Sequence, residues 1–188
     1  MLVAATLPLL IEHGAKVTTR MIAEAAGVAE GTIFRVFPDK ETLIRAAMWQ
    51  VFDPEPTLAD LRTVDMGLPL RIRILQVTSI LQRRMLRVFN LMLALRRQPP
   101  QPDDETWRPA AQTANQAVNA SIVRILEPDA HQLRWPPMEV ARVLRLLIFS
   151  ASHPLITEGA LMRADEITEV VLDGLLRREP QPDQDGGH

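Results

Sequence analysis

The sequence predicts an all-α protein, and three observations lead to that fold class. Apolar residues recur at intervals of three and four along most of the chain, which is the spacing of one face of an α-helix. No segment shows the strict alternation of apolar and polar residues that marks a half-buried strand. Glycine and proline stand between the apolar segments, where helices usually end. We therefore expect a series of helices joined by turns and loops.

The first helix is expected to end near residue 14. Leu2, Thr6 and Leu10 follow helical spacing, and Gly14 is a natural stop. Pro8 stands inside this segment and should kink it unless it lies in the first turn.

Residues 18–40, TTRMIAEAAGVAEGTIFRVFPDK, predict two short helices separated by a turn. Thr18 is a suitable N-cap for the first, Gly27 closes it, and the second begins at Ala29 or Glu30. The residues expected to press the two helices together are Ile22, Ala26, Val28, Ile33 and Phe37. Thr32, Arg35 and Val36 then point outward. This is the arrangement by which a helix-turn-helix places a recognition helix in a DNA major groove.

A fourth helix is expected over residues 39–52, since Pro38 breaks the chain and Asp39 can cap a helix that begins after it. The cluster DPEPT at 53–57 is rich in helix breakers and predicts a domain boundary. We expect a helix-turn-helix domain over residues 1–52, a larger helical domain over 53–179 and a disordered tail over 180–188.

The larger domain is expected to hold the remaining helices. A short helix near 58–64 precedes a long apolar stripe over 70–95, which predicts one long helix or two in series. QPPQPDD at 98–104 predicts a loop, and a further helix should cover about 105–126. The run VARVLRLLIFSA at 140–151 is apolar on nearly every side, so we expect it to be covered on more than one face. In the last helix, about 164–178, Gly174 suggests close approach of another helix.

Composition limits the class of protein but does not indicate its partner. Hydrophobic residues make up 47% of the 188 residues, which is enough for a full core. The net charge of −2, and the equal numbers of basic and acidic side chains in residues 1–52, are unusual for a protein that contacts phosphates. Charge alone does not indicate DNA.

The remaining composition points to the cytoplasm. The absence of cysteine excludes disulfides and thiolate metal sites. No apolar run is long enough for a membrane span, and the first 14 residues lack the features of a signal peptide. The histidines show no metal-ligand spacing. We expect a cytoplasmic protein with no cofactor and no membrane partner.

The motifs HG, VTTRMIAEAAGV, GTIFR and FPDKETLI together resemble the DNA-binding domain of tetracycline-repressor-like (TetR family) bacterial transcription regulators. The resemblance covers about a quarter of the chain. It implies that the N-terminal domain binds operator DNA and that the larger domain binds a small-molecule effector. It also implies a homodimer in which the last two helices of each copy form a four-helix bundle. The expected function is that of a ligand-responsive regulator, most simply a repressor released by a small, mostly apolar effector, and not of an enzyme.

The resemblance also implies DNA-contacting residues. Phosphate contacts fall on Thr18, Thr19 and Lys40. The base-reading positions are Arg20, Glu30, Gly31, Thr32, Phe34, Arg35 and Val36. Arg35 has the chemistry for bidentate contact with guanine. Three departures stand out: Phe34 replaces a frequent tyrosine, Glu30 brings an acid to the groove, and the usual basic stretch before the first helix is absent.

Residues of the larger domain are candidates for an effector pocket and for the dimer interface. The pocket candidates are Met85, Phe89, Met92, Trp107, Asn115, Asn119, Phe149 and His153. Ordinary core packing or a solvated helix edge explains each of them as well. The interface candidates are Val140, Leu144, Leu147, Ile148, Ile167, Val171, Gly174 and Leu175.

Two alternatives remain open at the level of sequence. The basic stretch Arg83, Arg84, Arg87, Arg96 and Arg97 is interpreted as a solvated helix face, with an anionic ligand or DNA approach as the alternatives. The whole chain could also be a small-molecule carrier or an enzyme on a regulator-like scaffold. No catalytic pair with an orienting partner is recognisable in the sequence.

Overall fold

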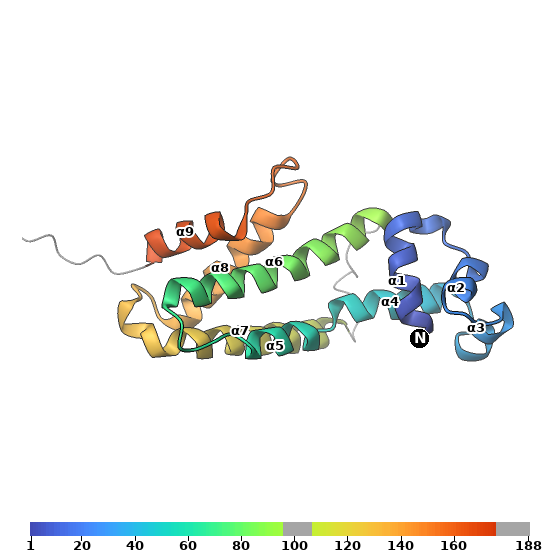
Figure 1. The fold of residues 1–188 in the computed structure, drawn as a ribbon, viewed down its shortest axis with the longest axis horizontal. Coiled ribbons are helices and arrows are strands. Elements are labelled where there is room, and N and C mark those ends of the chain that lie inside the picture. Colours follow the sequence, from blue (N-terminus) through green and yellow to red (C-terminus); the bar gives the residue numbers. More distant parts are fainter. Residues whose placement is uncertain (96–106, 176–188) are drawn as a thin grey trace, which may run out of the picture.

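The computed structural model describes residues 1–95 and 107–175, and the regular elements of this part of the chain are all helices, with no strand. The prediction of an all-α fold is confirmed. The helices form a small group of short elements at one end and a larger group at the other, which α6 joins (Figure 1). No helix in the described ranges is long and apolar enough to cross a membrane.

The N-terminal group has four α-helices and one 3₁₀ turn. They are α1 (Leu2–His13), η1 (Gly14–Lys16), α2 (Thr19–Ala25), α3 (Glu30–Val36) and α4 (Lys40–Phe52). α1 packs against α2 and α4, and α2 packs against α3. The side chains of Leu10, Ile22, Ile33 and Leu43 are fully buried at the centre of this group.

Local chemistry sets the ends of these helices as the sequence predicted. The Thr18 hydroxyl accepts a hydrogen bond from the Met21 amide at 3.2 Å, and the Asp39 carboxylate accepts one from the Thr42 amide at 2.7 Å. Gly27 has a φ of +66°, which is the conformation that ends α2 after its last turn. α1 continues through Pro8 as one helix.

The larger group contains five α-helices and one 3₁₀ helix. They are α5 (Glu55–Arg62), α6 (Leu70–Leu95), α7 (Trp107–Leu126), η2 (Glu127–Gln132), α8 (Pro137–Ser152) and α9 (Ala164–Leu175). The stripe over 70–95 is therefore one long helix. α6 packs against α5, α8 and α9, and α7 packs against α5 and α8. The expected loop at 98–104 and tail at 180–188 lie outside the described residues.

A buried arginine fastens the start of α6 to the end of α7. Arg73 is 2% exposed, and its Nη1 donates to the Ile125 carbonyl at 2.6 Å while its Nε donates to the Leu68 carbonyl at 3.0 Å. The same guanidinium forms an ion pair with Asp129. This charge is thus paired and hydrogen-bonded, which is the condition under which a buried arginine is tolerated.

The end of α6 belongs to the N-terminal core. Leu91 and Met92 are buried with Leu10 and the other core residues of that group. Gly14 lies so close to this helix end that a Cβ atom there would stand 2.3 Å from the Ala94 carbonyl oxygen. The two groups of helices are therefore joined through α6 as well as through the chain at residues 52–55. The domain boundary at residue 52 stays a prediction.

Candidate nucleic-acid interface and effector domain

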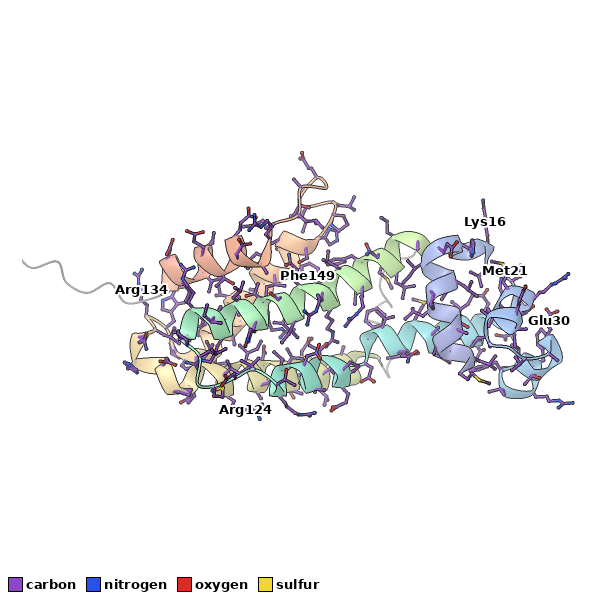
Figure 2. The ribbon with its side chains drawn as sticks, in the orientation of Figure 1. Lys16, Met21, Glu30, Arg124, Arg134 and Phe149 are labelled. Carbon is purple, nitrogen blue, oxygen red and sulfur yellow. The ribbon has the colours of Figure 1, made fainter. Side chains whose placement is uncertain are left out.

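α3 presents an exposed face with both apolar and basic side chains. Ile33 is fully buried against the core, whereas Phe34 is 53% exposed and Val36 is 62% exposed. Gly31 and Arg35 are exposed as well. Glu30, at the start of α3, lies at the end of the molecule opposite to Arg134 (Figure 2). Nothing in the described part of the chain covers this surface of α3, which can therefore contact another molecule.

The Glu30 carboxylate forms a hydrogen bond with Thr19 within the protein. Its Oε1 accepts a hydrogen bond from the Thr19 hydroxyl at 2.5 Å, which links the start of α3 to the start of α2. The single hydroxyl proton of Thr19 is thereby used, so in this arrangement the side chain cannot donate to a phosphate. The Thr18 hydroxyl only accepts, from Met21, and its proton remains available. No signal in the sequence indicates the bond between Thr19 and Glu30.

Lys40 and Asp39 lie at the start of α4, beside the start of α2. The Lys40 ammonium donates to the Val17 carbonyl at 3.3 Å, and two of its protons remain for other acceptors. Hydrogen bonds from Thr42 hold the pKa of Asp39 below its usual value, so the carboxylate stays charged. Thr18, Lys40 and the exposed face of α3 remain the candidate DNA contacts, and Arg20 is exposed on α2.

This region has a recognisable family. Residues 2–47 match the family model described as bacterial regulatory proteins, tetR family. The N-terminal domain belongs to the tetR family. The match ends within α4, and residues after 47 lie outside it. No protein of curated function is significantly similar to the chain in sequence.

Solved structures resemble the chain over most of its length. A tetR-family regulator from Streptomyces coelicolor is 25% identical, with a TM-score of 0.64, over 92% of this chain and 76% of that one. A putative tetR-family regulator from Vibrio parahaemolyticus is 19% identical, with a TM-score of 0.62, over 94% and 97%. SmeT of Stenotrophomonas maltophilia in complex with triclosan is 19% identical, with a TM-score of 0.60, over 97% of each chain. The helical C-terminal domain is therefore like that of tetR-family regulators.

Some of the candidate pocket residues come together where α6 meets α8. The Phe89 ring lies 5.3 Å from the Phe149 ring and 4.6 Å from the His153 ring, measured between centroids. Met85 is half-buried against the hydrophobic core of the larger group of helices. The side chain of Trp107 lies outside the described residues. Whether these residues bind an effector stays a prediction.

Met92, Asn115 and Asn119 were predicted to line the effector pocket, but in the structure they have other contacts. Met92 is 8% exposed and packs in the N-terminal core, because α6 extends past the larger domain. Asn115 and Asn119 both accept hydrogen bonds from Arg145, at 2.6 and 2.8 Å. Sequence analysis missed Arg145, although an arginine within the apolar run VARVLRLLIFSA is itself a signal.

The dimer residues proposed from the sequence need correction. The five that lie in the chain's own core, with side chains between 0 and 3% exposed, are Val140, Leu144, Ile148, Ile167 and Val171. Their apolar surface is already covered by this chain, so it cannot also cover a second copy. Leu147 is half-buried, Gly174 is exposed, and the side chain of Leu175 lies outside the described residues.

Other apolar residues of α8, of α9 and of the segment between them are exposed, in place of the buried interface candidates. These are Met138, Leu146 and Phe149 on α8, Leu155, Ile156 and Leu161 between the two helices, and Val170 on α9. The described residues hold no group of three His, Asp or Glu side chains that could bind a metal ion.

Proposed function

We propose that this protein is a ligand-responsive transcriptional repressor that binds a pseudo-palindromic operator as a homodimer. The exposed face of α3 carries the proposal. Phe34 and Val36 leave more than half of their surface uncovered on a seven-residue helix that is otherwise anchored by Ile33. A helix of this kind, within a tetR-family domain, has the geometry for entry into a major groove.

Self-association would use Leu146 on α8, Val170 on α9 and the exposed apolar residues of the segment between the two helices. Leu146 is 59% exposed and Val170 is 53% exposed, although both belong to helices whose other face is buried. Apolar surface concentrated in this way is typical of an interface. A twofold dimer would set two α3 helices about one turn of DNA apart, as a pseudo-palindrome requires.

Sedimentation equilibrium tests the interface. Leu146→Glu together with Val170→Glu should give a monomer, because two charges would be buried without partners. Ile11→Glu is the matched control, since Ile11 is 46% exposed on α1, away from these helices. A dimer that survives the double substitution would exclude this surface.

Release by a small molecule would act through the contacts between the two groups of helices. α4 and α6 both pack against α1, so a change in the position of α6 reaches the tetR-family domain directly. To weaken operator binding 100-fold, the effector must bind the released state more tightly by about 2.7 kcal/mol. SmeT is described as a repressor of a multidrug efflux pump and forms a complex with triclosan, which supports a repressor of this kind.

A gel-shift experiment with the DNA upstream of the protein's own gene tests the proposal. At low salt we expect a retarded band that unlabelled specific DNA displaces more readily than random DNA does. Phe34→Glu should abolish the band without loss of helical content, since Phe34 is exposed. No band across the upstream region, or an unchanged band for Phe34→Glu, would contradict the proposal.

A further inference from the structure

Two arginines of the larger domain have no carboxylate within ion-pair distance in the described part of the chain. Arg84, on α6, donates from Nη2 to the Phe52 carbonyl at 2.9 Å, while its Nε is buried without a partner. Arg145, on α8, donates to the amide oxygens of Asn119 and Asn115. Both side chains are half-buried, so each is partly removed from water while its charge is unmatched.

The two guanidinium groups also repel each other. Burial lowers the pKa of Arg84 most, and the positive charges of Arg145 and then Arg87 lower it further. The negative charge of Asp53 raises the pKa of Arg84, which is the opposite effect, and no ion pair joins the two side chains in the described part of the chain. Burial also lowers the pKa of Arg145. Unmatched charge that is partly desolvated is unfavourable in the free protein, and an anion between the two groups would relieve it.

The α6 and α8 surfaces that bring the arginines together continue into an aromatic cluster. Phe149 lies one helical turn beyond Arg145, and Phe89 lies five residues beyond Arg84. The centroids of the two rings lie 5.3 Å apart, where α6 packs against α8. His153 contacts both rings, and its buried Nδ1 has no hydrogen-bond partner. Positive charge and apolar surface are therefore adjacent at one place in the domain.

We propose that Arg84 and Arg145 bind the carboxylate of an amphipathic effector whose apolar body lies against Phe89 and Phe149. This inference rests on the proposed function, because it names the class of molecule to which the regulator responds. Guanidinium groups bind carboxylates through charge-assisted and often bidentate hydrogen bonds. Asn115 and Asn119 are positioning residues, since both accept hydrogen bonds from the Arg145 guanidinium.

Calorimetry on the full-length protein tests the site with paired probes. The probes are octanoate and 4-phenylbutyrate, each compared with its own uncharged amide at constant ionic strength. We expect at least one acid to bind about tenfold or more tightly than its amide, because only the acid can pair with the arginines. If neither acid binds more tightly than its amide, the proposal is wrong.

Substitutions then assign the effect to the two arginines. Arg84→Gln and Arg145→Gln should each weaken binding of the acid about tenfold or more and change that of the amide less than twofold. The matched controls are Arg83→Gln, next to Arg84 on α6, and Arg142→Gln, one turn before Arg145 on α8, since both side chains are exposed. Equal losses in the controls would overturn the assignment.

Thermal unfolding without any probe separates a binding role from a structural one. Since each charge is unmatched in the free protein, Arg84→Gln and Arg145→Gln should melt at or above the temperature of the unsubstituted protein. A clear fall in melting temperature would show instead that the arginines stabilise the fold.

Measuring whether the acids and amides release the protein from its operator tests the anion site and ligand-responsive repression separately. If the acid binds through the two arginines but leaves the operator complex intact, the anion site stands and ligand-responsive repression fails. If amides release the operator as well as acids do, repression stands and the anion site is wrong.

Discussion

Replacing Gly14 by alanine should destabilise the contact between the tetR-family domain and the end of α6. Gly14 has a φ of +57°, and its position faces the backbone carbonyl of Ala94. An alanine at this position would be strained twice, once by its backbone conformation and once by its Cβ.

The structure allows the size of the effect to be worked out. With a ψ of −132°, Gly14 lies outside the left-handed helical region, and a non-glycine residue in so sparsely populated a conformation costs about 1–3 kcal/mol. The added Cβ would stand 2.3 Å from the Ala94 oxygen, where real Cβ atoms essentially never come nearer than 3.0 Å. The obstacle is backbone rather than a flexible side chain, so a backbone shift costing about 1–3 kcal/mol is needed. We expect Gly14→Ala to lower the free energy of unfolding by about 2–6 kcal/mol.

Urea unfolding at a fixed protomer concentration measures this, with two other glycines as controls. Gly27 has a φ of +66° but nothing within 4 Å of its Cβ position, so Gly27→Ala should cost only the backbone strain of about 1–2 kcal/mol. Gly31 lies within α3 with open space around it, so Gly31→Ala should stabilise the helix by up to about 1 kcal/mol.

The comparison between Gly14→Ala and Gly27→Ala shows whether the close contact between Gly14 and Ala94 affects stability. If the two substitutions cost the same within about 0.5 kcal/mol, which is the usual scatter of such measurements, the contact between Gly14 and Ala94 has no energetic weight. The junction between α1 and α6 would then be looser than the distance between Gly14 and Ala94 implies.

Three other substitutions test separate parts of the structure and of its proposed function. Glu30→Gln should raise operator affinity about fivefold in fluorescence anisotropy, because it removes a negative charge near phosphates, and a charge pair 4 Å apart in water is worth about 1 kcal/mol; unchanged affinity would place Glu30 away from DNA. Arg73→Met should lower the free energy of unfolding by about 3–5 kcal/mol in urea, since it leaves the Asp129 carboxylate unpaired; a loss below 1 kcal/mol would argue against a structural role. Gly174→Leu should disturb self-association, as nothing in the described part of the chain approaches its Cβ position; an intact dimer in sedimentation would exclude Gly174 from the interface.

Local signals in the sequence were sufficient to predict the helix ends and the buried residues of the tetR-family domain. Thr18, Gly27 and Asp39 act on backbone groups no more than a few residues away, so their identity and spacing predict the ends of α2 and α4. Burial of Ile22 and Ile33 follows from the same short-range pattern.

Contacts between distant parts of the chain could not be predicted in this way. Periodicity predicted the long helix α6 but not that Met92 would enter the N-terminal core, because the pattern of a stripe is the same whichever core covers it. In α8, a run that is apolar on nearly every side does not distinguish Leu144, inside the chain, from Leu146, which is exposed. The bonds from Arg145 to Asn115 and Asn119 span 30 and 26 residues, beyond the reach of any local signal.

The proposed function depends above all on the exposed face of α3, which is expected to read base pairs in a major groove. The dissociation constant of the unsubstituted protein and of Arg35→Ala, measured on an operator and on its set of single base-pair variants at one salt concentration, tests this role. We expect Arg35→Ala to lose about 1–3 kcal/mol on the operator and to lose its preference at one base pair in each half-site. Equal weakening on every sequence would make Arg35 a backbone contact, and no weakening on any sequence would contradict base reading by α3.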